Sequence, residues 1–149
     1  MYNVYLAGAM SGRNLDEVLR EREQAKKLLR EQGLTFYDPA SDEDLNEVSK
    51  KGWINNNFNK SRMEWYVKKD LKAVSQCDCV LNITGDLMSD GCAWEMAFAV
   101  YARQLPVYIV APLRKSRKKM GFTNILVDGI FNTVEEAVCH ISNKVLENH

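Results

Sequence analysis

The sequence contains only two histidines, three prolines and no long apolar segment. Both histidines, His140 and His149, lie near the C-terminus without an evident partner, which argues against a histidine-activated nucleophile. No apolar run approaches the roughly 20 residues that span a bilayer, and the first residues lack the basic leader of a signal peptide. We therefore expect a cytoplasmic protein that makes no membrane contact.

The four cysteines do not form a metal-binding pattern. Cys77 and Cys79 are separated by one residue, whereas zinc sites usually separate such a pair by about two to four. Cys92 and Cys139 are isolated, and in a chain without a secretory signal all four are expected to be reduced thiols. The sequence therefore predicts no metal site, and no motif in it requires a cofactor.

Acidic and basic residues balance, with 20 of each. Such a chain has no overall electrostatic field that would attract nucleic acid or an anionic membrane. We expect no nucleic-acid partner, and any charged ligand must be bound by local groups.

Short apolar segments alternate with amphipathic segments along the whole chain. The strands are expected at 3–8, 34–39, 77–84, 105–111 and 124–129, and the helices at 12–33, 61–76, 90–102 and 132–147. This alternation predicts an α/β fold of the doubly wound, flavodoxin-like or Rossmann-like kind, in which a mainly parallel five-stranded sheet has helices on both faces. The chain has the length of one domain, and we expect an irregular insertion at 40–59.

The ends of two helices carry recognisable signals. Asn14 and Thr133 precede the first and last helices, and each is followed three residues later by a glutamate, as in a capping box. Gly33 is the expected stop signal of the first helix.

Three loops are expected at the edge where ligands bind to parallel sheets, beyond the carboxyl ends of the strands. They are AGAMSGR (7–13), TGDLMSDG (84–91) and APLRKSRKK (111–119). The first is rich in glycine but matches neither the dinucleotide-binding pattern nor the P-loop, although Gly8 and Gly12 would permit a close approach of ligand to backbone. The third is basic, which suits either a bound phosphate or a solvated loop.

The helix expected at 90–102 is apolar almost all round and contains a single glutamate, Glu95. Such a helix should be buried on most sides, and an ionised carboxylate inside it needs a reason. Glu95 lies near the helix N-terminus, where the helix dipole favours a negative charge. A purely structural charge is the less attractive interpretation, because no arginine or lysine stands beside Glu95 in the sequence.

Two aspartates are expected at the same edge as Glu95. Asp70 belongs to a stripe on helix 61–76 that should face the sheet, whereas the neighbouring lysines should face outward. The stripe contains Met63, Val67, Asp70, Leu71 and Val74, and the outward lysines are Lys68, Lys69 and Lys72. Asp90 could instead be only an N-cap, and Asp70 could simply tie its helix to a loop. Three acids without a histidine suit a carboxylate nucleophile and a carboxyl proton carrier, as in glycosyl transfer.

The segments VYLAGAMSG (4–12), KKDLKAVSQCDCVLNITG (68–85) and SDGCAWEMAFA (89–99) resemble the nucleoside 2-deoxyribosyltransferase superfamily. This superfamily includes the 2'-deoxynucleoside 5'-monophosphate N-glycosidases. The resemblance implies that Glu95 attacks C1' of the sugar and forms a covalent glycosyl-enzyme. It also implies that Asp70 and Asp90 bind the sugar and base and assist proton transfer.

The resemblance further implies a set of substrate contacts and a homodimer or larger homo-oligomer. The expected contacts are Tyr5, Gly8, Met10, Ser11, Gly12, Ser89 and Gly91. Ser89 stands where the monophosphate branch contacts the 5'-phosphate, but Ser11 replaces an arginine of that branch, with Arg13 two residues later. Subunits would pack through the side of the helix that carries Trp94, Phe98 and Tyr101.

Several alternatives stay open at this point. The ligand could be a nucleoside or its 5'-monophosphate, and the reaction could be transfer to another base or hydrolysis. A protein that binds a nucleotide without cutting it is the competing function on the same fold. A weaker option is an interaction protein that uses its apolar helix as an assembly surface.

Overall fold

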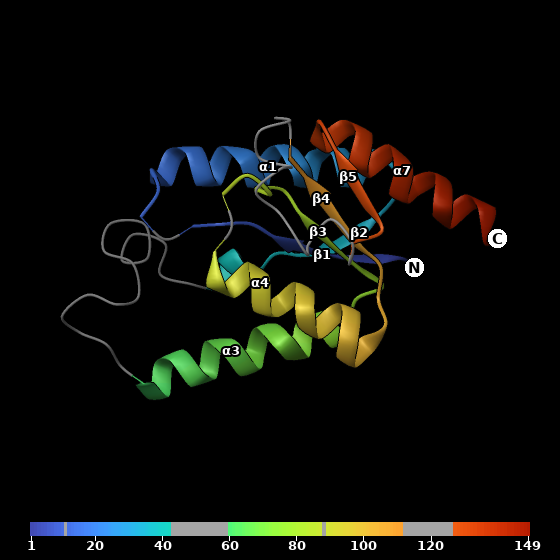
Figure 1. Cartoon of the computed structure of the whole chain (residues 1–149). Helices are drawn as coiled ribbons and strands as arrows, with labels where there is room; N and C mark the ends of the chain where they lie inside the picture. The colour runs from blue at the N-terminus through green and yellow to red at the C-terminus, as the bar shows by residue number, and fades with distance from the viewer. Residues whose placement is uncertain (11, 43–59, 88, 112–126) are drawn as a thin grey trace.

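The computed structural model describes residues 1–10, 12–42, 60–87, 89–111 and 127–149, and its strands form one parallel sheet (Figure 1). The strands are β1 (Asn3–Ala7), β2 (Thr35–Tyr37), β3 (Cys79–Asn82), β4 (Val107–Val110) and β5 (Gly129–Phe131). Their order is β2-β1-β3-β4-β5, which is the flavodoxin-like order and confirms the predicted fold class. The direction of winding reverses between β1 and β3, so loops from both strands meet at the same edge.

Helices cover both faces of the sheet, as predicted. They are α1 (Leu15–Glu31), α3 (Lys60–Ser75), α4 (Asp90–Ala97) and α7 (Val134–Glu147), with a 3-10 turn η1 (Pro39–Asp42) and a π-helical segment η2 (Phe98–Ala102) that continues α4. Figure 1 shows α1 and α7 on one face and α3 and α4 on the other. Each face has its own apolar core: side chains alternate along the strands, so Leu6 enters the layer under α1 while Tyr5 enters the layer under α4.

The predicted helix ends are confirmed. The side chain of Asn14 accepts a hydrogen bond from the backbone N–H of Glu17 at 3.2 Å, and Thr133 accepts one from Glu136 at 3.2 Å. Gly33 follows α1 with a φ of +69°, a conformation that costs a glycine little.

The last strand was predicted too early in the chain. The structure pairs Gly129, Ile130 and Phe131 with β4, whereas the prediction put the strand at 124–129. The apolar residues Ile125, Leu126 and Val127 suggested a strand, but the paired residues follow the bend at Asp128. The carboxylate of Asp128 accepts a hydrogen bond from the N–H of Val107 at 2.9 Å. Residues 124–126, like most of the predicted insertion at 40–59, lie outside the described residues.

The prediction that helix 90–102 is buried on most sides is wrong. Trp94 and Tyr101 are 73% and 69% exposed, and only Cys92, Met96 and Ala99 are buried. The helix has α3 beside it and the sheet beneath it, so one stripe faces inward and the opposite side is open to solvent. Apolar composition did not reveal this, since an apolar side chain does not have to be buried.

The inward face of α3 is also displaced from its predicted position. Val67 is 51% exposed, whereas Tyr66, Ala73 and Val74 are buried and Asp70 is partly buried. Asp70 therefore lies on the inner side, as predicted, but in a stripe that contains Tyr66 instead of Val67. The side chain of Met63 lies outside the described set.

A buried arginine joins α1 to the carboxyl ends of β1 and β2. Arg22 is 2% exposed, and its guanidinium donates to the carbonyl oxygens of Leu6 at 3.2 Å and Gly8 at 2.9 Å. It also pairs with the carboxylate of Asp38, directly after β2, at 2.7 Å. A buried charge is stable only when it is paired and hydrogen-bonded, and Arg22 meets both conditions.

The carboxylate of Asp38 is shared among three donors. Besides Arg22, it accepts from the N–H of Ala40 at 3.0 Å, and Nζ of Lys26 lies 2.6 Å from its second oxygen. A Cβ atom at Gly8 would lie 3.1 Å from the side chain of Ile83, which is a tight contact, and 3.4 Å from the guanidinium of Arg22, so the glycine lets the chain pass close to Ile83.

We predict that Arg22→Met lowers the free energy of unfolding by about 3–5 kcal/mol, because it removes one of the three donors of the buried Asp38 carboxylate and the guanidinium that binds the carbonyl oxygens of Leu6 and Gly8. Urea denaturation followed by circular dichroism measures the change. Arg20→Met on the exposed side of the same helix is the matched control and should change stability by less than about 0.5 kcal/mol. If Arg22→Met lowered the free energy of unfolding no more than Arg20→Met, the ion pair of Arg22 with Asp38 would not be what stabilises this edge of the sheet.

Candidate active site

Glu95 lies in the second turn of α4, and its carboxylate is held from the sheet below. The hydroxyl of Tyr5 donates a hydrogen bond to Oε1 of Glu95 at 3.0 Å. Tyr5 is fully buried in β1, and Glu95 is partly buried. The sequence suggested Tyr5 as a substrate contact, whereas in the structure its hydroxyl contacts Glu95. The two residues are 90 positions apart, so only the fold brings them together.

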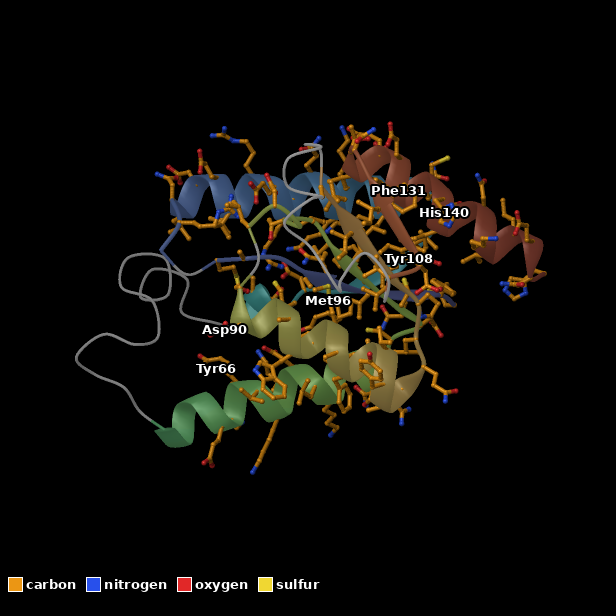
Figure 2. All side chains as sticks on the ribbon, in the orientation of Figure 1. Tyr66, Asp90, Met96, Tyr108, Phe131 and His140 are labelled. Carbon is orange, nitrogen blue, oxygen red and sulfur yellow. The ribbon has the colours of Figure 1, made fainter. Side chains whose placement is uncertain are left out.

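The N-terminus of α4 is capped by Ser89, and the alternative that Asp90 is the N-cap is wrong. The hydroxyl oxygen of Ser89 accepts from the N–H of Cys92 at 3.2 Å, and Asp90 is the first helical residue. Figure 2 shows Asp90 at this end of α4, where it is exposed. The dipole argument therefore applies better to Asp90 than to Glu95, which lies five residues further on.

Asp70 is accompanied by a lysine that was expected to face outward. Nζ of Lys69 lies 3.5 Å from Oδ1 of Asp70, and the two side chains are only 16% and 14% exposed. The same ammonium lies 5.1 Å from the ring centre of Tyr66 and 5.4 Å from that of Trp65. These contacts turn Lys69 inward and place a positive charge beside the Asp70 carboxylate.

A buried polar network ties the loops after β1 and β3 to α4. The N–H of Ala9 donates to the hydroxyl of Thr84 at 2.8 Å, and the N–H of Thr84 donates to Oδ1 of Asn82 at 3.0 Å. Nδ2 of Asn82 lies 3.7 Å from the sulfur of Met96, which follows Glu95 in the chain. Asn82 and Thr84 are almost fully buried. The signal for this network in the sequence is the presence of the polar Asn82 and Thr84 within the otherwise apolar run CVLNIT.

The loop after β1 is partly used for internal contacts. Gly8 is buried, and the side chains of Ile83, Arg22 and Thr84 lie close to it. Gly12 is exposed with a φ of +73°, and Met10 is partly exposed, so these two remain available at the surface. Ser11 lies outside the described residues, as does the basic segment 114–119.

Arg13 makes contacts within the protein. Its guanidinium donates to the carbonyl of Ala9 at 2.9 Å and to both oxygens of Glu21, at 2.6 and 2.8 Å. These contacts close the turn that carries Gly12. The side chain is 14% exposed, so its charge is largely used within the protein.

The cysteines are free thiols, as predicted, and three of them are poor nucleophiles. Burial raises the pKa of Cys77 to about 11 and that of Cys79 to about 12. Burial also raises the pKa of Cys92, and the Glu95 carboxylate raises it further, while the guanidinium of Arg22 lowers it. At neutral pH these thiols stay protonated, which leaves carboxylates as the candidate nucleophiles near α4.

The described residues contain neither a metal-binding cluster nor a membrane-spanning helix. Within the described ranges, no three His, Cys, Asp or Glu side chains are grouped so that they could hold a metal ion. In the same part of the chain, no helix combines the length and the apolar character needed to cross a bilayer.

Solved structures share this fold. A 2-deoxyribosyltransferase from Bacillus psychrosaccharolyticus matches with a TM-score of 0.65 and 23% identity over 91% of this chain and 90% of that one. A conserved protein from Enterococcus faecalis V583 matches with a TM-score of 0.63 and 18% identity over 97% and 99% of the two chains. The CMP N-glycosidase BcmB from Clostridium botulinum matches with a TM-score of 0.56 and 16% identity over 95% and 98%. At these identities the likeness establishes the fold.

The family itself is identified from the sequence. No curated protein sequence matches the chain significantly. The family model described as nucleoside 2-deoxyribosyltransferase matches residues 4–136, which include all of the sheet except Asn3 and contain the segments around Tyr5, Asp70 and Glu95. This protein therefore belongs to the nucleoside 2-deoxyribosyltransferase family.

Proposed function

We propose that this protein cleaves or transfers the N-glycosidic bond of a nucleoside or nucleoside 5'-monophosphate, with a 2'-deoxy sugar preferred and Glu95 as the nucleophile. The observation that carries the proposal is the 3.0 Å hydrogen bond from the buried Tyr5 hydroxyl to Oε1 of Glu95. It supports a carboxylate that is held in one orientation before the substrate binds. Membership of the family supports the type of bond, as do the printed names of the 2-deoxyribosyltransferase and the CMP N-glycosidase that share the fold.

In the proposed reaction, a carboxylate oxygen of Glu95 attacks C1' of the sugar. The electron pair of the C1'–N bond passes to the base, which leaves with a proton from an acid. The positive charge that develops on the sugar ring is stabilised by the adjacent carboxylate. A second base or a water molecule then attacks C1' and loses its proton to the group that protonated the first base, while the bond from C1' to the Glu95 oxygen breaks and restores the carboxylate. Attack by a base gives transfer, and attack by water gives hydrolysis.

We assign sugar binding, base binding and proton transfer to Asp70 and Asp90. Asp70 lies on the inner side of α3 next to α4, and the charge of Lys69 beside it supports an ionised carboxylate. Asp90 is exposed at the start of α4 and can reach a ligand there. Ser89 and the exposed Gly91 flank it, and the N-terminus of this helix suits a 5'-phosphate if the substrate carries one.

We further propose that the protein forms a homodimer or larger homo-oligomer through the outer side of α3 and α4. Trp94 and Tyr101 are exposed on one element and Trp65 and Val67 on the other, and the two elements pack against each other. Large apolar side chains that are exposed in one chain are often covered by another subunit.

The first prediction concerns the nucleophile. Deoxynucleosides, ribonucleosides and their 5'-monophosphates are incubated with the protein, with and without an acceptor base, and base release or exchange is followed by chromatography. Glu95→Ala should lower the rate by at least about 1000-fold, because it removes the carboxylate on which the proposed glycosyl intermediate forms. Glu64→Ala, an exposed glutamate on α3, is the control and should retain wild-type activity. Ligand binding by the wild type without any product would favour the non-catalytic alternative.

The second prediction concerns the orientation of Glu95. Tyr5→Phe keeps the buried ring and removes one hydrogen bond to a charged group, so kcat should fall about tenfold or more with little change in KM. Tyr2→Phe removes a weaker hydroxyl contact, 3.5 Å from the carbonyl of Asp78, and serves as the matched control. Equal activity of Tyr5→Phe and Tyr2→Phe would remove the support for the Tyr5 contact.

The third prediction concerns assembly. Light scattering after size exclusion should give the wild type a mass of at least twice the 17.1 kDa of one chain, and the double variant Trp94→Glu/Tyr101→Glu a mass of one chain. Leu146→Glu changes a residue that is 71% exposed on α7, across the sheet, and should leave the mass unchanged. A wild type that elutes as one chain would contradict the proposal.

A further inference from the structure

We propose that Tyr37 is a positioning residue of the active site, which acts on Glu95 through the ring of Tyr5. The inference rests on the proposed function and adds a residue of β2 to the site, a strand in which no site residue was predicted. The structural observation is that the hydroxyl that binds Glu95 belongs to a ring stacked on the ring of Tyr37.

The stack follows from the register of the sheet. Tyr5 and Tyr37 are direct partners in the parallel pairing of β1 with β2, so their side chains leave the sheet on the same face. Their ring centres are 5.8 Å apart and the ring planes differ by 16°. Both rings contribute to the apolar layer beneath α3 and α4, with Tyr5 fully buried and Tyr37 partly buried.

Tyr37 is the larger of the two sheet neighbours of the Tyr5 side chain. On the other side, Tyr5 is paired with Val80 of β3, a short side chain that is fully buried. A valine contacts only the base of an adjacent tyrosine ring, whereas a stacked ring can support its whole length. Because the hydroxyl lies at the far end of the ring, a small tilt toward β2 would lengthen the 3.0 Å bond to Glu95. The ring of Tyr37 prevents that tilt.

The position of Tyr37 is itself fixed by the buried ion pair. Tyr37 is the last residue of β2, and the next residue is Asp38, whose carboxylate is held by Arg22 and Lys26. The same guanidinium binds the carbonyl oxygens of Leu6 and Gly8 at the end of β1. The two strands that carry the stacked rings are thus joined just beyond both rings.

The test is a double-mutant cycle between the two tyrosines. Tyr37→Leu removes the stacked ring and should lower kcat about tenfold with KM changed less than about twofold, as loss of the Tyr5 contact does. In the Tyr5→Phe background, which has no hydroxyl to position, Tyr37→Leu should lower kcat by no more than about twofold further. Losses that multiply in the double variant would overturn the proposal.

Two further variants separate positioning from general damage to β2. Phe36→Leu removes an aromatic ring from the same strand on the opposite face, where Phe36 lies under the guanidinium of Arg30, and should leave kcat within about threefold of the wild type. Tyr37→Phe keeps the ring and should recover most of the activity that Tyr37→Leu loses. If Tyr37→Phe were as damaging as Tyr37→Leu, the ring would not be the active feature and the proposal would fail.

A readout without substrate distinguishes failure of this inference from failure of the proposed function. In protein labelled with 13Cζ-tyrosine, the Tyr5 resonance is assigned by its loss in Tyr5→Phe. Tyr37→Leu should move this resonance toward its position in Glu95→Ala, whereas Phe36→Leu should leave it in place. An unmoved resonance in Tyr37→Leu would contradict the positioning role, whether or not the wild type turns over a nucleoside.

Discussion

The buried guanidinium of Arg22 is the interaction on which the carboxyl edge of the sheet depends. A buried charge must have fixed partners, and those of Arg22, which lies on α1, come from two places: the carbonyl groups at the end of β1 and the carboxylate directly after β2. The Asp38 carboxylate neutralises the Arg22 guanidinium and also binds Lys26 and the N–H of Ala40. This network restricts the backbone of the two loops that follow β1 and β2.

The candidate site is built directly on this constraint. Tyr5 lies just before the carbonyl groups that Arg22 binds, and its hydroxyl meets the Glu95 carboxylate on the face opposite α1. A second network, through Thr84 and Asn82, joins the same loop to the end of β3 and to α4. The Glu95 carboxylate is thus held both by a contact from the sheet and by its position on α4. The proposed nucleophile would therefore not have to be reoriented when the substrate binds.

Features that depend on nearby residues could be predicted from the sequence, and features that depend on distant contacts could not. Strand and helix alternation, the Asn14 and Thr133 caps and the inward placement of Asp70 are local, and the structure bears them out. The outward placement of Lys69 was wrong because two aromatic rings and a carboxylate draw it inward. Arg22 lies in the buried stripe of α1 with Val18, Ala25 and Leu29. Helical spacing alone would have placed it there, but an arginine is normally expected at the surface. The pairing of Tyr5 with Glu95 required the three-dimensional structure.

The central claim is that Glu95 forms the covalent bond to the sugar. Mass spectrometry of the protein, quenched during reaction with a 2'-fluoro nucleoside that slows release of the sugar, tests it most directly. The account predicts a mass increase of one glycosyl group, located after digestion on the peptide that contains Glu95 and absent from Glu95→Gln. Turnover of an unmodified substrate combined with no adduct, or with an adduct on another residue, would contradict it.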